Sequence, residues 1–244
     1  MGRFTVAVTR AGRTARTERA AVTRERILAA AERLFAEHGV FAVSNRQVGE
    51  AAGQGNTAVV GYHFGTKTDL VRAIVRWHAA RVEQLRGDRV AAVAGSTDVR
   101  DWVTCLVRPN ADHLAALGPP TWYARFGAQL MTDPTLRPIM VTESLASPAL
   151  QAAIDGLDRC LPALPPEVRA ERGEIGRHLM VHVFAERERA LADGAPTPRA
   201  TWADAATGLV DAITAVWLAP VTPTGGPGRH PRPDPGAPPT KGLP

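Results

Sequence analysis

One stretch early in the chain allows only short helices. Ser44 and Gln47 have the spacing of a capping box, in which each side chain satisfies a backbone donor of the other residue. Gly53 ends the helix that begins there after barely two turns, and residues 54–56 supply a tight turn. A second short helix is expected from about Thr57 to His63, so the pattern predicts a helix-turn-helix.

Longer helices are expected on both sides of this motif. The segment "TRERILAAAERLFAEHG" has Thr23 as a candidate N-cap, apolar residues at helical spacing, and Gly39 just past the last turn. After the motif, Thr66 and Asp69 form a second candidate capping box. The helix that begins there is expected to reach about Gly87 and to join the first part of the chain to the rest.

The remainder of the chain also favours helix, because few windows alternate at period two and alanine is frequent. Breaks rich in Gly and Pro separate helices expected at about 98–117, 121–132, 143–160, 168–192 and 200–218. The sequence therefore predicts an all-α fold, with an N-terminal three-helix head that contains the helix-turn-helix and a C-terminal helical body. The last two helices are amphipathic, and their apolar face needs a partner, which predicts a homodimer with its interface mainly within 168–218.

The chain divides into four predicted parts. Residues 1–20 are expected to be a flexible basic arm, 21–68 the helix-turn-helix domain, 69–219 the helical body, and 220–244 a disordered Pro/Gly tail. The N-terminus lacks the apolar region of an export signal, and no apolar stretch is suited to a membrane span. A cytoplasmic protein without a membrane partner is therefore expected.

Positive charge is concentrated in the front third. Residues 1–90 hold 15 Lys and Arg against 8 Asp and Glu, net +7, whereas residues 91–244 hold 14 against 16, net −2. This asymmetry favours a head that binds a polyanion, although a solvated basic face is the alternative. The arginines of the arm are expected either to lie in the minor groove of DNA or only to raise non-specific affinity.

The sequence gives no support for catalysis or for a bound metal or cofactor. It contains no nucleophile with a general base and no phosphate-binding glycine loop. His178 and His182 are one helical turn apart, a spacing that can hold a metal, but the absence of a third ligand nearby favours a packed or interface pair. Cys105 and Cys160 are expected to be reduced.

The residues around the motif carry a family likeness. "TRERILAAAERLFAEHGVFAVSNRQVGEAAG", followed by "AVVGYHFGTKTDLV", closely resembles the DNA-binding head of the tetracycline-repressor (TetR) family of transcription regulators. The similarity extends over about residues 23–71. It implies a sequence-specific regulator, most simply a repressor that binds a pseudo-palindromic operator as a dimer and is released by a small hydrophobic ligand.

Candidate DNA contacts follow from the geometry of the motif. A helix N-terminus in the major groove presents its first turn to base edges, so the candidate base readers are Asn56, Thr57 and Ala58. The candidate contacts to phosphates are Tyr62 and His63 at the end of that helix, Lys67 at the start of the next, and Arg46 on the preceding one. The resemblance implies the same roles for the residues after Gly61.

In the family, the body holds a ligand pocket, and aromatic and polar residues here are candidates to line it. They are Trp102, His113, Trp122, Tyr123, Phe126, His178 and His182. Two other classes of function remain open. One is a non-specific architectural nucleic-acid-binding protein, and the other is an enzyme whose pocket binds a small acid or lipid, which no residue pattern recommends.

Overall fold

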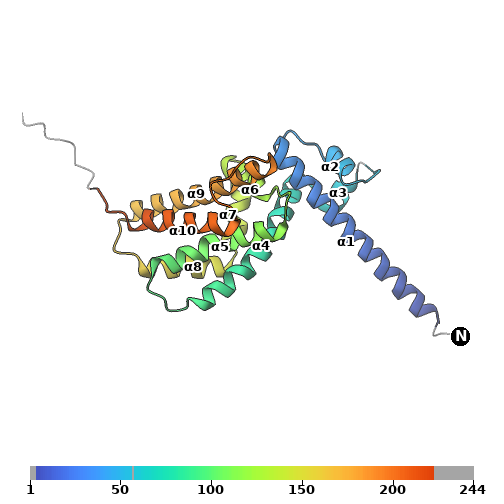
Figure 1. Ribbon diagram of the computed structural model, residues 1–244. Helices are drawn as coiled ribbons and strands as arrows, with labels where there is room; N and C mark the ends of the chain where they lie inside the picture. The colour runs from blue at the N-terminus through green and yellow to red at the C-terminus, as the bar shows by residue number, and fades with distance from the viewer. Residues whose placement is uncertain (1–3, 57, 223–244) are drawn as a thin grey trace, which may run out of the picture.

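The computed structural model describes residues 4–56 and 58–222, with side-chain surroundings from Thr17 onward. Helices are the only regular elements in these ranges, and they form a small head at one end of a longer helical body (Figure 1). The predicted all-α architecture is confirmed. The helices are α1 (Phe4–His38), α2 (Asn45–Ala51), α3 (Val59–Phe64), α4 (Lys67–Ala92), α5 (Val99–Leu117), α6 (Tyr123–Thr132), α7 (Arg137–Leu145), α8 (Pro148–Cys160), α9 (Pro166–Ala192) and α10 (Trp202–Leu218).

Helix α1 is much longer than the sequence pattern indicated. It was expected to begin at Thr23 but begins at Phe4 and projects away from the body (Figure 1). Residues 4–22 are rich in alanine and arginine and contain one glycine and no proline, so helix propensity extends the helix past the candidate N-cap. The expectation of an irregular arm is therefore wrong for residues 4–20, while residues 1–3 lie outside the described ranges.

Both predicted capping boxes are present. The Gln47 amide donates to Ser44 Oγ at 3.2 Å, and the Ser44 amide donates to Gln47 Oε1 at 2.8 Å, which fixes the start of α2. Thr66 and Asp69 make the same reciprocal pair at the start of α4. Gly53 has a φ of +71°, a backbone conformation that favours glycine and lets the chain turn from α2 towards α3.

The body helices match the expected ones except in the middle. The single helix expected over 143–160 is wrong, because α7 and α8 occupy this region with a break at Ala146 and Ser147. Ser147 accepts a hydrogen bond from the Leu150 amide at 3.0 Å, and Pro148 occupies the first helical position, where its missing N–H costs nothing. Helix α4 continues past Gly87 to Ala92, since one helical glycine costs only about 1 kcal/mol.

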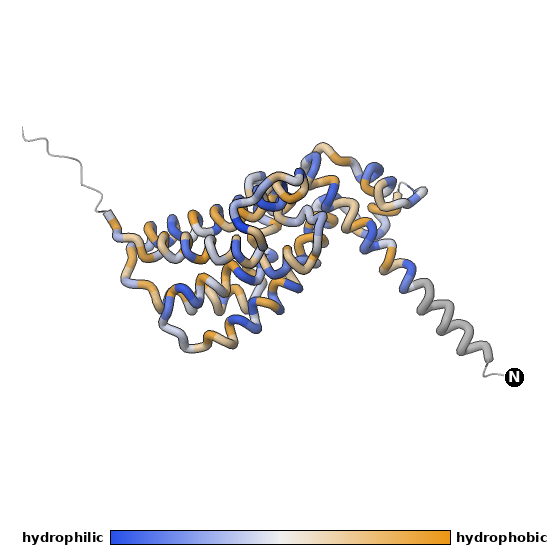
Figure 2. Tube along the Cα trace, in the orientation of Figure 1, coloured by the Kyte–Doolittle hydropathy of each residue, from blue (hydrophilic) through white to orange (hydrophobic). Residues whose placement is uncertain are grey.

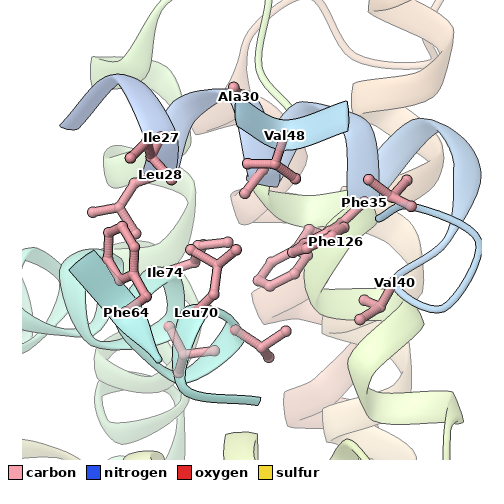
Figure 3. Close-up of a cluster of buried hydrophobic side chains, with 14 of the residues drawn as sticks. Ile27, Leu28, Ala30, Phe35, Val40, Val48, Phe64, Leu70, Ile74 and Phe126 are labelled. Carbon is pink, nitrogen blue, oxygen red and sulfur yellow. The ribbon is translucent and has the colours of Figure 1, made fainter. Parts of the chain in front are cut away.

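The core of the head extends into the body. Buried residues of α1 to α4 pack together with Phe126 and Leu130 of α6 and with Ile139 of α7 (Figure 3). Phe126 is fully buried and stacks on Phe35 of α1, with 6.3 Å between the ring centroids. The domain boundary expected at residue 69 therefore does not separate two independent cores.

A second core fills the rest of the body. Hydrophobic and hydrophilic residues alternate along the body helices (Figure 2), and the hydrophobic ones of α5, α8, α9 and α10 pack around Trp102. Gly156 of α8 provides room for the indole, because a Cβ atom there would lie only 2.2 Å from Trp102 Cε3. Within the ranges that the structure describes, none of the helices combines the length and apolar content that crossing a membrane requires.

A buried polar chain joins head and body. His78 of α4 is fully buried, with its Nε2 2.8 Å from Glu32 Oε2 of α1 and its Nδ1 2.7 Å from His113 Nε2 of α5. A carboxylate accepts, so His78 donates to Glu32 through Nε2–H, and one proton lies between His78 Nδ1 and His113 Nε2. The ring of Tyr123, at the start of α6, stacks on the His78 imidazole with 3.6 Å between centroids. These four residues connect α1, α4, α5 and α6.

Helix α6 is held at both ends. The buried carboxylate of Glu188, on α9, accepts from the backbone amides of Ala124 and Arg125 at 3.1 and 2.9 Å and from Arg125 Nε at 3.2 Å. A carboxylate at a helix N-terminus also interacts favourably with the helix dipole. Near the other end, Gln129 Nε2 donates to the Ala36 carbonyl of α1 at 2.9 Å. Helix α6 thus ties α9 to the head.

The polar chain makes stability depend on pH. Burial, reinforced by His78 and Arg81, lowers the pKa of His113 from 6.5 to about 4. Between these values the unfolded chain binds a proton that the folded chain does not, so the free energy of unfolding falls as the pH falls from 6.5 to about 4. Urea unfolding across this range tests the prediction. A His113→Gln variant should lose this part of the pH dependence, and an unchanged profile would contradict it.

Candidate nucleic-acid interface

Helix α3 is packed by one face and exposed on the other. Val48 of α2 and Val60 of α3 are fully buried against the head core. At Gly49 the two helices lie close together, since a Cβ atom there would make ordinary van der Waals contact with Val59 Cγ1 at 3.5 Å and with the Asn56 carbonyl at 3.8 Å. The opposite face of α3 is left free to enter a groove of DNA.

Tyr62 is the most prominent side chain on the free face of α3. It is 82% exposed, and its ring meets the His63 ring edge-on with 5.1 Å between centroids. A phenol combines an apolar ring with a hydroxyl that donates, so it suits a contact to the sugar-phosphate backbone. The structure thus brings two of the predicted phosphate contacts, Tyr62 and His63, side by side.

An Asx turn precedes α3. Asn56 Oδ1 accepts a hydrogen bond from the Ala58 amide at 2.9 Å, two residues further along the chain. The Asn56 oxygen keeps a second lone pair and its nitrogen remains free, so the side chain retains the groups that reading adenine requires. Ala58 is exposed on the first turn, as expected of a base reader. Thr57 lies outside the described residues.

Lys67 has a structural role that the sequence did not indicate. Its ammonium donates to the carbonyls of Val40 and Val43 at 3.1 and 2.5 Å and thereby pins the α1–α2 loop to the start of α4. An ammonium has three donors, so one N–H remains for a phosphate. Lys67 therefore supports the loop of the head, and its contact to a phosphate stays a prediction.

Arg46 remains available at the surface. Its side chain is 72% exposed, and its Nε lies 3.0 Å from Glu50 Oε1 one turn along α2. Exposed pairs of this spacing are worth only about 0.3–0.5 kcal/mol, so a phosphate can readily displace Glu50.

Arg24 makes a contact to α3 that the sequence does not predict. Its Nη1 donates to the His63 carbonyl at 2.8 Å, and its guanidinium lies 4.1 Å from the centroid of the Phe64 ring. Arg24 thus fixes the end of α3, and with it the direction of Tyr62. Because the hydrogen bond spans 39 residues, no local motif could have revealed it.

A groove of about 460 Å³ opens beside this contact. Two arginines that line the groove form ion pairs: Arg72 lies 3.0 Å from Asp69, and Arg76 lies 2.8 Å from Glu143. The hydrogen bond from Thr66 lowers the pKa of Asp69 and so keeps that carboxylate ionised. The lining residues are Arg24, Leu28, Phe64, Asp69, Arg72, Ala73, Arg76 and Trp77.

The body residues expected to line one pocket lie in four places. Trp102 belongs to the second core, and Trp122 and Phe126 belong to the head core. His178 and His182 are exposed on α9 with 6.2 Å between ring centroids. His113 and Tyr123 come together in the chain around His78. Periodicity cannot distinguish a pocket from a core, because both use the buried face of a helix.

The described residues contain no group of three or more His, Cys, Asp or Glu side chains arranged to hold a metal ion. Cys105 and Cys160 are both free thiols.

Comparison with known proteins agrees with this geometry. Residues 27–74 match the family model described as "Bacterial regulatory proteins, tetR family", and residues 104–215 match "Tetracyclin repressor-like, C-terminal domain". Together the two models cover most of the chain.

Curated relatives and a solved structure are also similar. The chain is 40% identical over 63 residues to the HTH-type transcriptional repressor AcnR of Corynebacterium glutamicum, covering 26% of this chain and 33% of that one. It is 27% identical over 122 residues to the HTH-type transcriptional regulator BetI of Rhizobium meliloti, covering 49% and 58%. The matches thus span a third to somewhat over half of these relatives.

A solved structure described as a TetR-family transcriptional regulator from Mesorhizobium loti aligns with a TM-score of 0.45 and 16% identity. The alignment covers 81% of this chain and 98% of that one.

The matched residues 27–74 contain the capped helices, the glycine turn and the exposed face of α3. The matched body contains the helices that hold this head in place. The chain belongs to the TetR family of DNA-binding transcription regulators, proteins that regulate genes rather than catalyse reactions.

Proposed function

We propose that this protein is a repressor in the cytoplasm that binds a pseudo-palindromic operator as a homodimer and is released by a small ligand. The observation that carries the DNA contact is the exposed face of α3, on which Tyr62 and His63 lie together at the end of a helix that Arg24 holds in place. The net charge of +7 over residues 1–90 supports a duplex as the partner.

The homodimer is supported by the surface of α9 and α10. These helices lie side by side on one flank of the body (Figure 1), and Gly176 lets them approach closely. The outer face of α9 carries Ile175 and Val183, each 40% exposed, and the exposed imidazoles of His178 and His182 lie between them along the helix. An apolar strip with polar edges is typical of an interface between subunits. Two heads held by such a dimer would enter successive major grooves, about 34–36 Å apart.

Release by a ligand follows from the attachment of the head. A ligand frees DNA only through its different affinity for two arrangements of the heads. Helix α6 contacts the head through Phe126 and Gln129, and contacts α9 through Glu188. A ligand in the body that displaces α6 therefore changes the position of the head relative to the dimer face.

The second candidate is a non-specific architectural protein, which the basic head also favours. Selection of random duplex DNA at about 150 mM salt separates the two. The proposed function predicts recovery of a palindromic site. Recovery of no preferred sequence would contradict it.

Tyr62→Ala should weaken binding to the selected site by about tenfold or more, since it removes an exposed contact without touching the core. The control is Trp77→Ala, which removes another half-exposed aromatic from α4. Fluorescence anisotropy with the selected duplex measures both variants. Equal effects of the two substitutions on DNA binding would show that α3 is not part of the DNA interface.

Lys67→Met should lower the stability of the protein as well as its affinity for DNA. It preserves the length of the side chain but leaves the Val40 and Val43 carbonyls without their donor, so the free energy of unfolding should fall by about 1–3 kcal/mol. Arg46→Ala is the control and should leave stability unchanged, because Arg46 is exposed. Urea unfolding measures both variants. A Lys67→Met protein of unaltered stability that binds DNA weakly would make Lys67 a phosphate contact alone.

A further inference from the structure

The groove beside Arg24 belongs to the head and is lined by three of its helices. Arg24 and Leu28 are one turn apart on α1, Ala73 and Trp77 are one turn apart on α4, and Phe64 closes α3 between them. Leu28 and Phe64 are nearly buried and lie together at one edge of the head core (Figure 3), whereas Trp77 is 53% exposed. A volume of about 460 Å³ is within the range of sites that bind small molecules.

Trp77 gives the groove an aromatic wall that is already fixed in place. Its indole packs against the ring of the buried His78, with 4.6 Å between the ring centroids, while over half of the Trp77 surface stays exposed. A ring held in this way loses little conformational entropy when a ligand stacks on it. Ala73 is small and leaves room beside the indole. The apolar part of the groove therefore suits a flat aromatic group.

The charges around the groove leave one positive charge uncompensated. Arg72 lies 3.0 Å from Asp69 and 3.6 Å from Glu143, and Arg76 lies 2.8 Å from Glu143. Two carboxylates thus compensate two arginines. Within residues 17–56 and 58–222, no carboxylate forms an ion pair with Arg24. A ligand with a single negative charge would complete this set.

The contacts that Arg24 already makes orient it for such a ligand. Its Nη1 donates to the His63 carbonyl at 2.8 Å, and the guanidinium lies over the Phe64 ring, 4.1 Å from the centroid. Nε and Nη2 have no hydrogen-bond partner among the residues that the structure describes. These two nitrogens share one edge of the guanidinium, and two parallel N–H donors on such an edge match the two oxygens of a carboxylate.

We propose that this groove binds an aromatic monocarboxylate, with the carboxylate on the Nε and Nη2 edge of Arg24 and the aromatic ring stacked on Trp77. A phosphate fits less well, because Asp69 lines the same groove and would repel a second negative charge. The site lies in the head and is additional to the proposed function, whose ligand acts from the body.

A bound acid would connect the helices of the head to one another. Arg24 already holds α1 to the end of α3 through the His63 carbonyl, and the ligand would join Arg24 to Trp77 of α4. Because the site is assembled from three helices, it exists only in the folded head. Binding should therefore raise the melting temperature of the protein.

Isothermal titration calorimetry on the full chain tests the site. The ligands are benzoate, 2-naphthoate and indole-3-acetate, each beside its amide, and octanoate serves as an acid without an aromatic ring. The expected result is that 2-naphthoate or indole-3-acetate binds about tenfold or more tightly than its amide and than octanoate, since the amide lacks the charge and octanoate lacks the ring.

Two substitutions test the two halves of the site. Trp77→Ala removes the stacking wall but leaves both cores intact, and should weaken binding of the best acid by about tenfold or more. Arg24→Met keeps a side chain that can pack on Phe64 but removes the donors, and should weaken binding by a similar factor. Arg26→Met is the matched control, because Arg26 is an exposed arginine of the same helix that does not line the groove.

No binding of any aromatic acid, or equal binding of each acid and its amide, would overturn the proposal. So would undiminished binding in Trp77→Ala and Arg24→Met, or octanoate that binds as tightly as the best aromatic acid. Selection of duplex DNA is measured separately. Binding of an acid that depends on Trp77 and Arg24, in a protein that selects no DNA sequence, would leave this site in place and contradict the proposed function alone.

Discussion

The contact between Phe35 and Phe126 is the constraint on which the head depends. Helices α2 and α3 are too short to bury much apolar surface, and α1 can cover only part of it. Phe126 completes this core from α6, so the helix-turn-helix is stabilised by a residue of the body. The same contact that supplies stability also makes the position of the head sensitive to α6, because a packed core transmits displacement rather than absorbing it.

Three polar attachments surround this apolar contact, and each connects α6 or its neighbours to a different surface. Glu188 holds α6 to α9, whose outer face is the proposed dimer contact. Gln129 holds it to α1. Tyr123 joins it to His78 and, through Glu32, to α1 again. The proposed dimer face and the DNA-binding head are therefore connected through one short helix, which is a physical basis for coupling between them.

Local features were predicted from the sequence more successfully than distant ones. The capping boxes at Ser44 and Thr66 depend on residues three positions apart, so the local sequence predicts them. The roles of Lys67 and Phe126 depend on partners 24 or more residues away along the chain. The sequence around Lys67 does not distinguish a residue that supports a loop from one that contacts a phosphate. The sequence around Phe126 does not distinguish a residue of the head core from one that lines a pocket. The sequence pattern predicts too short an α1, because Thr23 is a suitable N-cap by its local context whereas the helix propensity of residues 4–22 extends the helix past it.

Hydrogen exchange of Phe126→Ala, followed by mass spectrometry of peptides from α2 and α3, tests the dependence of the head on α6 most directly. Loss of the ring should speed amide exchange in α2 and α3, since their core loses its contact with the body. Phe184→Ala removes an equally buried ring from the second core and should leave those amides protected as before. Unchanged protection in Phe126→Ala, or the same loss in both variants, would contradict the account.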